Sequence, residues 1–127
     1  MIEPRRHSTI TPTVVMGCLV VTLPTDLAHE LDGLQSLVLE GVRGASVRAA
    51  VLDFSSVRVV DCAEFAKVRG VVDMARLMGA RVFLVGLRPG VVAYLVDNDA
   101  DISGLEVERG LEDALERMAS SDGGASG

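Results

Sequence analysis

The chain has 127 residues, which is enough for one domain with a buried core. Hydrophobic residues make up 49% of it but aromatic residues only 3%, and there is no tryptophan, so the core must consist mainly of aliphatic side chains. The formal net charge of −6 argues against a basic, phosphate-binding surface and therefore against a nucleic-acid partner.

The apolar runs and the cysteines exclude further classes of protein. The longest strongly apolar run, residues 14–23, is far shorter than the roughly 20 residues that cross a bilayer, and no secretory signal pattern precedes it. Cys18 and Cys62 have no metal-ligand spacing with His7 or His29. We therefore expect a cytoplasmic protein with no membrane partner, no metal site, no disulfide framework and no cofactor.

Composition predicts a single folded domain between two irregular ends. Residues 1–12 are polar and contain two prolines, which predicts a flexible lead-in. Residues 120–127, SSDGGASG, predict a disordered tail. The domain is expected to span residues 13–119.

The first part of the domain predicts two strands and a helix. Residues 13–16 and 18–23 are β-prone segments separated by Gly17. Asp26 is a candidate N-cap for a helix that ends within residues 41–44. The apolar side chains of that helix recur at helical spacing, namely Leu27, Leu31, Leu34, Val38 and Val42.

The middle of the chain predicts a buried strand followed by a second helix. Residues 48–54 form a short apolar run whose length suits a strand covered on both faces. A helical pattern then extends to Gly79, with Asp61 or Cys62 as its cap. The face expected to be buried comprises Ala63, Ala66, Gly70, Met74, Leu77 and Met78, with Phe65 and Val72 beside it.

The last third predicts two strands and two helices. Residues 81–85 form a strand, and Pro89 lies near the start of a helix over residues 90–96. A brief strand is expected at 105–107, followed by an amphipathic helix through Met118. This order of elements predicts an α/β fold with a mostly parallel central sheet and about four helices packed on it.

Candidate catalytic motifs have structural explanations. Ser55 and Ser56 lack the G-x-S-x-G context of a nucleophile and are typical of a turn. Residues 86–90 lack the glycine pattern of a nucleotide loop, and residues 97–101 lack the offsets of a calcium loop. We expect no enzyme, and a flavodoxin-like or hydrolase-like enzyme with a ligand pocket at the strand ends is the alternative.

The chain resembles the STAS domain family, the sulfate transporter and anti-sigma factor antagonist domains. The resemblance is carried by residues 51–57 (VLDFSSV), 59–62 (VVDC) and 75–89 (ARLMGARVFLVGLRP), and it extends from about residue 14 to 118. Leu77-Met-Gly-Ala80, Gly86-Leu-Arg-Pro89 and Ala66-Lys67-Val68 most resemble the bacterial RsbS type of stressosome scaffold. The resemblance implies co-assembly with other STAS proteins, as homo- or hetero-oligomers including large shells, and reversible capture of a switch Ser/Thr kinase.

Cys62 departs from the family pattern. The resemblance implies a phosphoacceptor Ser or Thr directly after the aspartate, whereas Asp61 is followed here by Cys62. No Ser or Thr occurs from Val57 to Ile102, so Ser55 and Ser56 are the nearest alternative phosphosites upstream. We therefore expect a scaffold for stress signalling whose phosphorylation switch is disabled and which holds its kinase constitutively or under the control of neighbouring subunits.

Several alternatives remain open. The chain could act as a stand-alone anti-sigma factor antagonist that binds an anti-sigma kinase one to one. A thiol at a helix N-terminus is also a candidate for oxidation, which would make the protein redox-responsive, although an inert, buried cap is the simpler interpretation. An introduced cysteine in an originally serine-bearing protein is the third alternative. The polar groups expected to bind the partner are Arg58, Asp61, Cys62, Glu64, Lys67 and Arg88.

Overall fold

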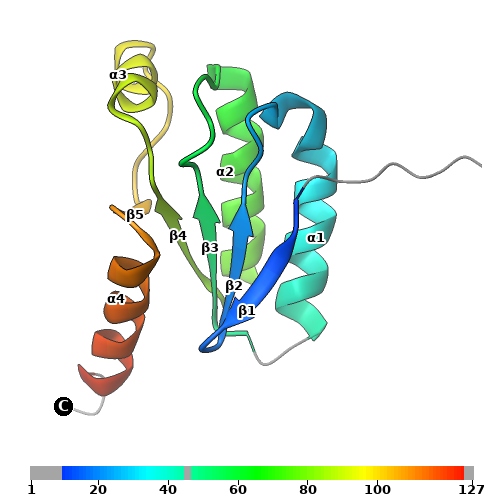
Figure 1. Cartoon of the computed structure of the whole chain (residues 1–127), viewed down its shortest axis with the longest axis vertical. Helices are drawn as coiled ribbons and strands as arrows, with labels where there is room; N and C mark the ends of the chain where they lie inside the picture. Colours follow the sequence, from blue (N-terminus) through cyan, green and yellow to red (C-terminus); the bar gives the residue numbers. More distant parts are fainter. Residues whose placement is uncertain (1–9, 45–46, 125–127) are drawn as a thin grey trace, which may run out of the picture.

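The computed structural model describes residues 10–44 and 47–124 and consists of a five-stranded sheet with helices on both faces (Figure 1). The strands are β1 (Pro12–Val15), β2 (Cys18–Thr22), β3 (Ala49–Asp53), β4 (Arg81–Val85) and β5 (Glu106–Glu108), in that spatial order. β1 pairs antiparallel with β2, and the other three pairings are parallel. The predicted fold class, a mostly parallel sheet with four α-helices packed on it, is confirmed.

The hairpin between β1 and β2 follows from its two turn residues. Met16 and Gly17 have φ angles of 52° and 80°, and positive φ at both central residues produces a tight turn whose twist matches that of the flanking strands. Val15 lies directly opposite Cys18 across this turn.

Helices cover the sheet unequally. A 3-10 turn, η1 (Leu27–Glu30), leads into α1 (Leu31–Gly44), which packs beside α2 (Cys62–Leu77) on one face of the sheet (Figure 1). α3 (Pro89–Asp97) adds Val91 and Leu95 to the core of that face. The opposite face has a smaller core, in which α4 (Leu111–Gly124) packs Ala114 and Met118 against β2, β3 and β4.

Both predicted ends of the domain differ from the structure. Residues 1–9 and 125–127, which belong to the expected lead-in and tail, lie outside the described residues. Within the expected lead-in, however, Ile10 is buried in the main core and β1 begins at Pro12. At the other end, α4 continues through residues 120–124, so the helix extends beyond the predicted boundary at residue 119.

The first predicted helix begins differently. Asp26 makes no side-chain cap, and the chain forms one 3-10 turn before α1 starts at Leu31. The Asp26 carboxylate instead accepts a hydrogen bond from the imidazole of His29, with 2.7 Å between Oδ2 and Nδ1. That hydrogen bond, together with the charge of Asp26, raises the pKa of His29.

The predicted buried face of α2 is wrong for most of its residues, although Phe65 and Val72, which were predicted beside it, are buried. Ala63, Ala66, Gly70 and Met78 are exposed, and the side chain of Leu77 is 89% exposed. The helix buries a different stripe at i, i+3 and i+4 spacing, namely Phe65, Val68, Val71, Val72 and Ala75. Apolar residues occur around most of this helix, and the bulkier stripe removes more apolar area from water, so packing on the sheet selects it.

Candidate functional site

The loop after β3 brings a short hydroxyl-bearing turn to the carboxyl edge of the sheet. Phe54 O accepts a hydrogen bond from Val57 N at 2.9 Å, which closes the turn and leaves Ser55 and Ser56 exposed at its tip. Asp53 Oδ1 accepts from Ser55 N at 2.9 Å, and Arg88 Nε donates to Ser55 O at 3.1 Å. The turn is therefore anchored to the ends of β3 and β4.

Asp61 begins α2 through a complete capping box. Its Oδ1 accepts a hydrogen bond from Glu64 N at 2.7 Å, and Glu64 Oε1 accepts from Asp61 N at 3.0 Å. Two backbone donors that the first turn of a helix leaves without helical partners are satisfied in this way. The predicted cap at Asp61 is confirmed, and it makes Cys62 the first residue of α2.

Cys62 lies between the start of α2 and the end of α3. Its side chain is half-buried, and Sγ donates a weak hydrogen bond to Asn98 O at 3.8 Å. Asn98 is the C-cap of α3, and its Nδ2 donates to Tyr94 O at 2.8 Å. Cys62 therefore faces the carbonyl end of a neighbouring helix.

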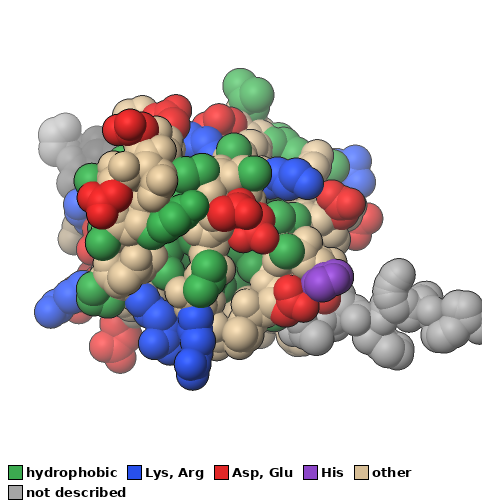
Figure 2. Space-filling model, turned by 90° about the horizontal axis from the view of Figure 1, so that it is seen from above, with side chains coloured by type: hydrophobic (Ala, Val, Ile, Leu, Met, Phe, Trp, Pro, Cys, Tyr) green, Lys and Arg blue, Asp and Glu red, His purple; other side chains and the backbone are tan. Residues whose placement is uncertain are grey.

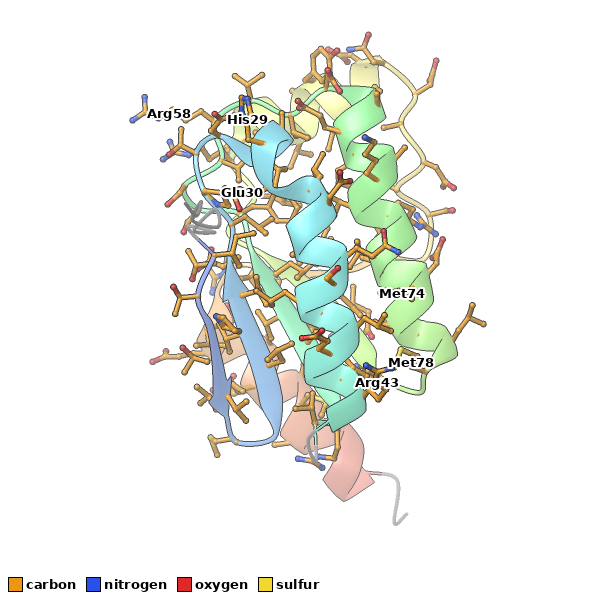
Figure 3. The ribbon with its side chains drawn as sticks, turned by 90° about the vertical axis from the view of Figure 1, so that its right-hand side faces the viewer. His29, Glu30, Arg43, Arg58, Met74 and Met78 are labelled. Atoms are coloured by element: carbon orange, nitrogen blue, oxygen red, sulfur yellow. The ribbon has the colours of Figure 1, made fainter. Side chains whose placement is uncertain are left out.

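The structure brings only some of the predicted partner-binding residues together. Arg58, Asp61, Cys62 and Arg88 come from loops and helix starts at the carboxyl ends of the parallel strands. Figure 3 shows Arg58 reaching outward at this end of the molecule. Lys67 instead lines a groove between α1 and α2 with Leu31, Asp32, Gln35, Gly70 and Val71. Lys67 and Cys62 thus face different neighbours of α2.

Apolar side chains are exposed at the same end of the molecule. Val59, three residues before Cys62, is 77% exposed, and Tyr94 on α3 is 44% exposed. Figure 2, which looks onto this end, shows hydrophobic side chains interspersed with acidic ones and a group of Lys and Arg side chains at one edge. Exposed apolar groups with a charged rim are typical of surfaces that contact other proteins.

Sequence reasoning missed the α3 side of the site. No sequence signal points to Asn98, yet its backbone carbonyl is the hydrogen-bond partner of Cys62, 36 residues away. Tyr94 is the only tyrosine of the chain, and its place within a short, apolar segment is the one signal that the sequence offers. The contact itself could not be predicted because it depends on how α2 and α3 pack.

The described residues, 10–44 and 47–124, lack two features of other protein classes. No group of three or more His, Cys, Asp or Glu side chains in these segments could hold a metal ion. No helix in the same segments is long and apolar enough to cross a membrane.

Comparison with solved structures finds the same fold in RsbS, in a stressosome chain and in an anti-sigma factor antagonist. A variant of RsbS from Moorella thermoacetica matches with a TM-score of 0.75 and 23% identity, over 88% of this chain and 98% of that one. A chain from the molecular architecture of the stressosome matches with a TM-score of 0.73 and 23% identity, over 86% and 98%. The anti-sigma factor antagonist SpoIIAA in its unphosphorylated form matches with a TM-score of 0.66 and 15% identity, over 87% and 98%.

At these identities the likenesses show the fold. No curated protein sequence matches the chain significantly. The family model for the STAS domain, however, matches residues 9–114, which is most of the chain and includes all five strands and the first three α-helices. The resemblance predicted from the sequence is thereby confirmed, and the chain belongs to the STAS domain family.

Proposed function

We propose that this protein is a non-enzymatic scaffold of a bacterial, stressosome-type signalling assembly that captures a switch Ser/Thr kinase and lacks the usual phosphorylation switch. The observation that carries the proposal is Cys62. It occupies the first position of α2 directly after the capping Asp61, where the family pattern has a phosphoacceptor hydroxyl. The fold shared with RsbS and with a stressosome chain supports the scaffold role.

The charge of a phosphate group is what would release a captured kinase. A phosphate adds about −1.5 to −2 charges, which can expel a bound partner through repulsion and desolvation. A thiol is not an ordinary substrate of a Ser/Thr kinase, and neither Ser nor Thr occurs from residue 57 to 102. Without a new charge at the start of α2, the captured kinase should remain bound.

The docking surface that we propose is centred on Cys62. Arg58, Val59 and Tyr94 supply exposed charged and apolar area around it. Asp61 and Glu64 act mainly by fixing the helix start, since each accepts a hydrogen bond from the other's backbone. Arg88 supports the adjoining turn through Ser55 O, and Lys67 is available to a partner that extends over α1.

The substitution Cys62→Ser tests this proposal directly. The unsubstituted protein and the C62S variant are each mixed with the switch kinase of the same genome, and bound kinase is measured before and after ATP addition. We expect both proteins to capture the kinase. After ATP, the variant should gain one phosphate at residue 62 and release most of the kinase, whereas the unsubstituted protein should keep it.

The double substitution of Ser55→Ala and Ser56→Ala in the otherwise unchanged protein is the matched control. It should capture and retain the kinase as the unsubstituted protein does. Phosphorylation of Ser55 or Ser56 in the unsubstituted protein, with release of the kinase, would show that the switch has moved upstream and would refute the disabled-switch proposal.

Oxidation of Cys62 is the second candidate, supported by the partial exposure of its side chain. A sulfenate or a small thiol cap would add bulk or charge where the family places a phosphate. The folded protein should then react with iodoacetamide at Cys62 and spare the buried Cys18, and mild peroxide should release the kinase. A Cys62 that stays unmodified in the folded protein would exclude this redox function.

A further inference from the structure

A cavity between α2, α3 and β5 is not used by the proposed docking surface. Its volume is about 260 Å³, and all of its lining residues are apolar: Phe65, Leu87, Val92, Leu95, Ile102, Leu105 and Val107. Phe65 and Leu95 form its buried wall, whereas Val92, Ile102 and Val107 are 39%, 44% and 49% exposed. The cavity therefore opens to solvent between α3 and β5.

The size and lining define the class of group that fits inside. An apolar cavity of about 150 Å³ stays dry and takes up benzene, so a space of about 260 Å³ suits a flexible chain of roughly six to ten carbon atoms. None of the seven lining side chains carries a polar atom. A ligand that enters must therefore keep any polar group outside, at the mouth.

The mouth of the cavity is polar and carries an accessible cation. A second, shallower depression shares Leu87, Val92 and Val107 with the cavity and adds Glu108 and Arg109. The Glu108 carboxylate is already paired with Arg117, at 3.3 Å between Oε2 and Nη1. The side chain of Arg109 is 95% exposed, and its ion pair with Asp113 is long, at 3.7 Å. Arg109 can thus turn toward an anionic group at the mouth with little loss of existing interactions.

We propose that this cavity binds a free medium-chain fatty acid, with the alkyl chain between α3 and β5 and the carboxylate paired with Arg109. The apolar lining suits the alkyl chain of the fatty acid, and the positive charge of Arg109 at the mouth suits its carboxylate. This inference does not rest on the proposed kinase scaffold, because it concerns a different set of side chains.

Octanoate is the probe for the first test. The full chain is labelled with 13C in its Val, Leu and Ile methyl groups and titrated with octanoate below its micelle concentration. We expect saturable shifts at Val92, Leu95 and Ile102, while the methyl groups of Val14 and Val38 stay unchanged. Affinity should rise about fourfold with each methylene from hexanoate to octanoate, since each added group is buried.

The same substitution at two valines one turn apart on α3 gives a matched pair of variants. Val92→Phe fills the cavity and should weaken octanoate binding at least tenfold. Val96→Phe adds the same group to an exposed valine that does not line the cavity, and it should leave the affinity unchanged. If V92F does not fold, Val107→Glu replaces it, because a carboxylate at the mouth should repel octanoate in the same way.

The head group is tested with Arg109→Gln. This variant should bind octanoate several-fold more weakly than the unsubstituted protein and octan-1-ol equally well, and Arg43→Gln on α1 should change neither affinity. Shifts that fail to saturate, or a folded V92F that binds octanoate as well as V96F does, would overturn the cavity site. Equal octanoate binding by R109Q and the unsubstituted protein would overturn the role of Arg109 and with it the proposed carboxylate ligand.

Discussion

Asp61 and Cys62 are adjacent at the start of α2, but the structure gives their side chains different partners. The carboxylate of Asp61 accepts a hydrogen bond from Glu64 N in the first turn of the helix. The thiol of Cys62 instead donates to Asn98 O at the end of α3. One residue therefore fixes where α2 begins, and the next is left at the surface between two helices. Capping makes Asp61 a structural residue whatever the partner is.

Loss of the cap should be measurable as stability. We expect Asp61→Ala to lower the free energy of unfolding by about 1 kcal/mol, because Glu64 N loses its acceptor, the carboxylate of Asp61. Urea denaturation at neutral pH measures this change in the free energy of unfolding. Asp73→Ala is the control, since Asp73 is exposed and makes only a 3.4 Å ion pair with Arg69; its loss should stay within about 0.5 kcal/mol. Equal losses in the two variants would contradict a stabilising cap.

At the scale of elements, the short strand β5 pairs with the backbone of β4, and one arginine of β4 adds a side-chain link to it. Arg81 on β4 donates to Glu106 from Nη2 at 2.6 Å and from Nε at 3.1 Å. Its guanidinium also lies over the ring of Phe83, 4.9 Å from the centroid, beside the face that α4 covers. The hydrogen bonds from Arg81 lower the pKa of Glu106, although partial burial opposes the shift.

This pairing predicts a pH-dependent contribution to stability. Because the pKa of Glu106 is lower in the folded than in the unfolded chain, its stabilisation is complete above the unfolded-state pKa and is lost as the pH falls through the folded-state pKa. Glu106→Gln should therefore cost about 0.5–1 kcal/mol at pH 7, and the difference from the unsubstituted protein should shrink as the pH falls from about 5 to 3.

Denaturant unfolding over this pH range provides the measurement, with Glu116→Gln on the exposed side of α4 as the control. A difference between E106Q and the unsubstituted protein that stays constant from pH 7 to pH 3 would show that the charge of Glu106 contributes nothing to stability.

At the scale of the whole molecule, the residues of the proposed docking surface are gathered at one end. The loops after β3 and β4, the start of α2 and the end of α3 all lie at the carboxyl edge of the sheet (Figure 1). This is the edge at which open parallel sheets generally place their binding groups. The rest of the molecule remains available for contacts with other STAS domains in the assembly that we propose.

Particle mass distinguishes the two binding roles. The protein is examined by light scattering alone, with a STAS partner of the same genome, and with the switch kinase before and after ATP. A scaffold should form a particle of many subunits with its STAS partner and keep the kinase after ATP. A small species that binds one kinase and releases it with ATP would identify a stand-alone anti-sigma factor antagonist instead.

The sequence by itself determined the order of the elements and the start of α2. The cores of β3 and β4 are short apolar runs bounded by polar residues, and the cap at Asp61 depends on a group only three residues away. Such signals are local, so neighbouring residues suffice to predict them. The resemblance around Asp61 likewise led to the proposal that Cys62 replaces a phosphoacceptor.

Only the tertiary structure decided which face of α2 is buried, what Cys62 touches and where a cavity remains. Residues 63, 66, 70 and 77 have helical apolar spacing, yet the sheet buries the stripe that contains Val68 and Val71 instead. The thiol of Cys62 meets a carbonyl 36 residues away, and the cavity is lined from α2, α3 and the segment around β5. These features depend on contacts between segments distant in the sequence, and the free energy of burying one face rather than another is settled only when those segments pack together.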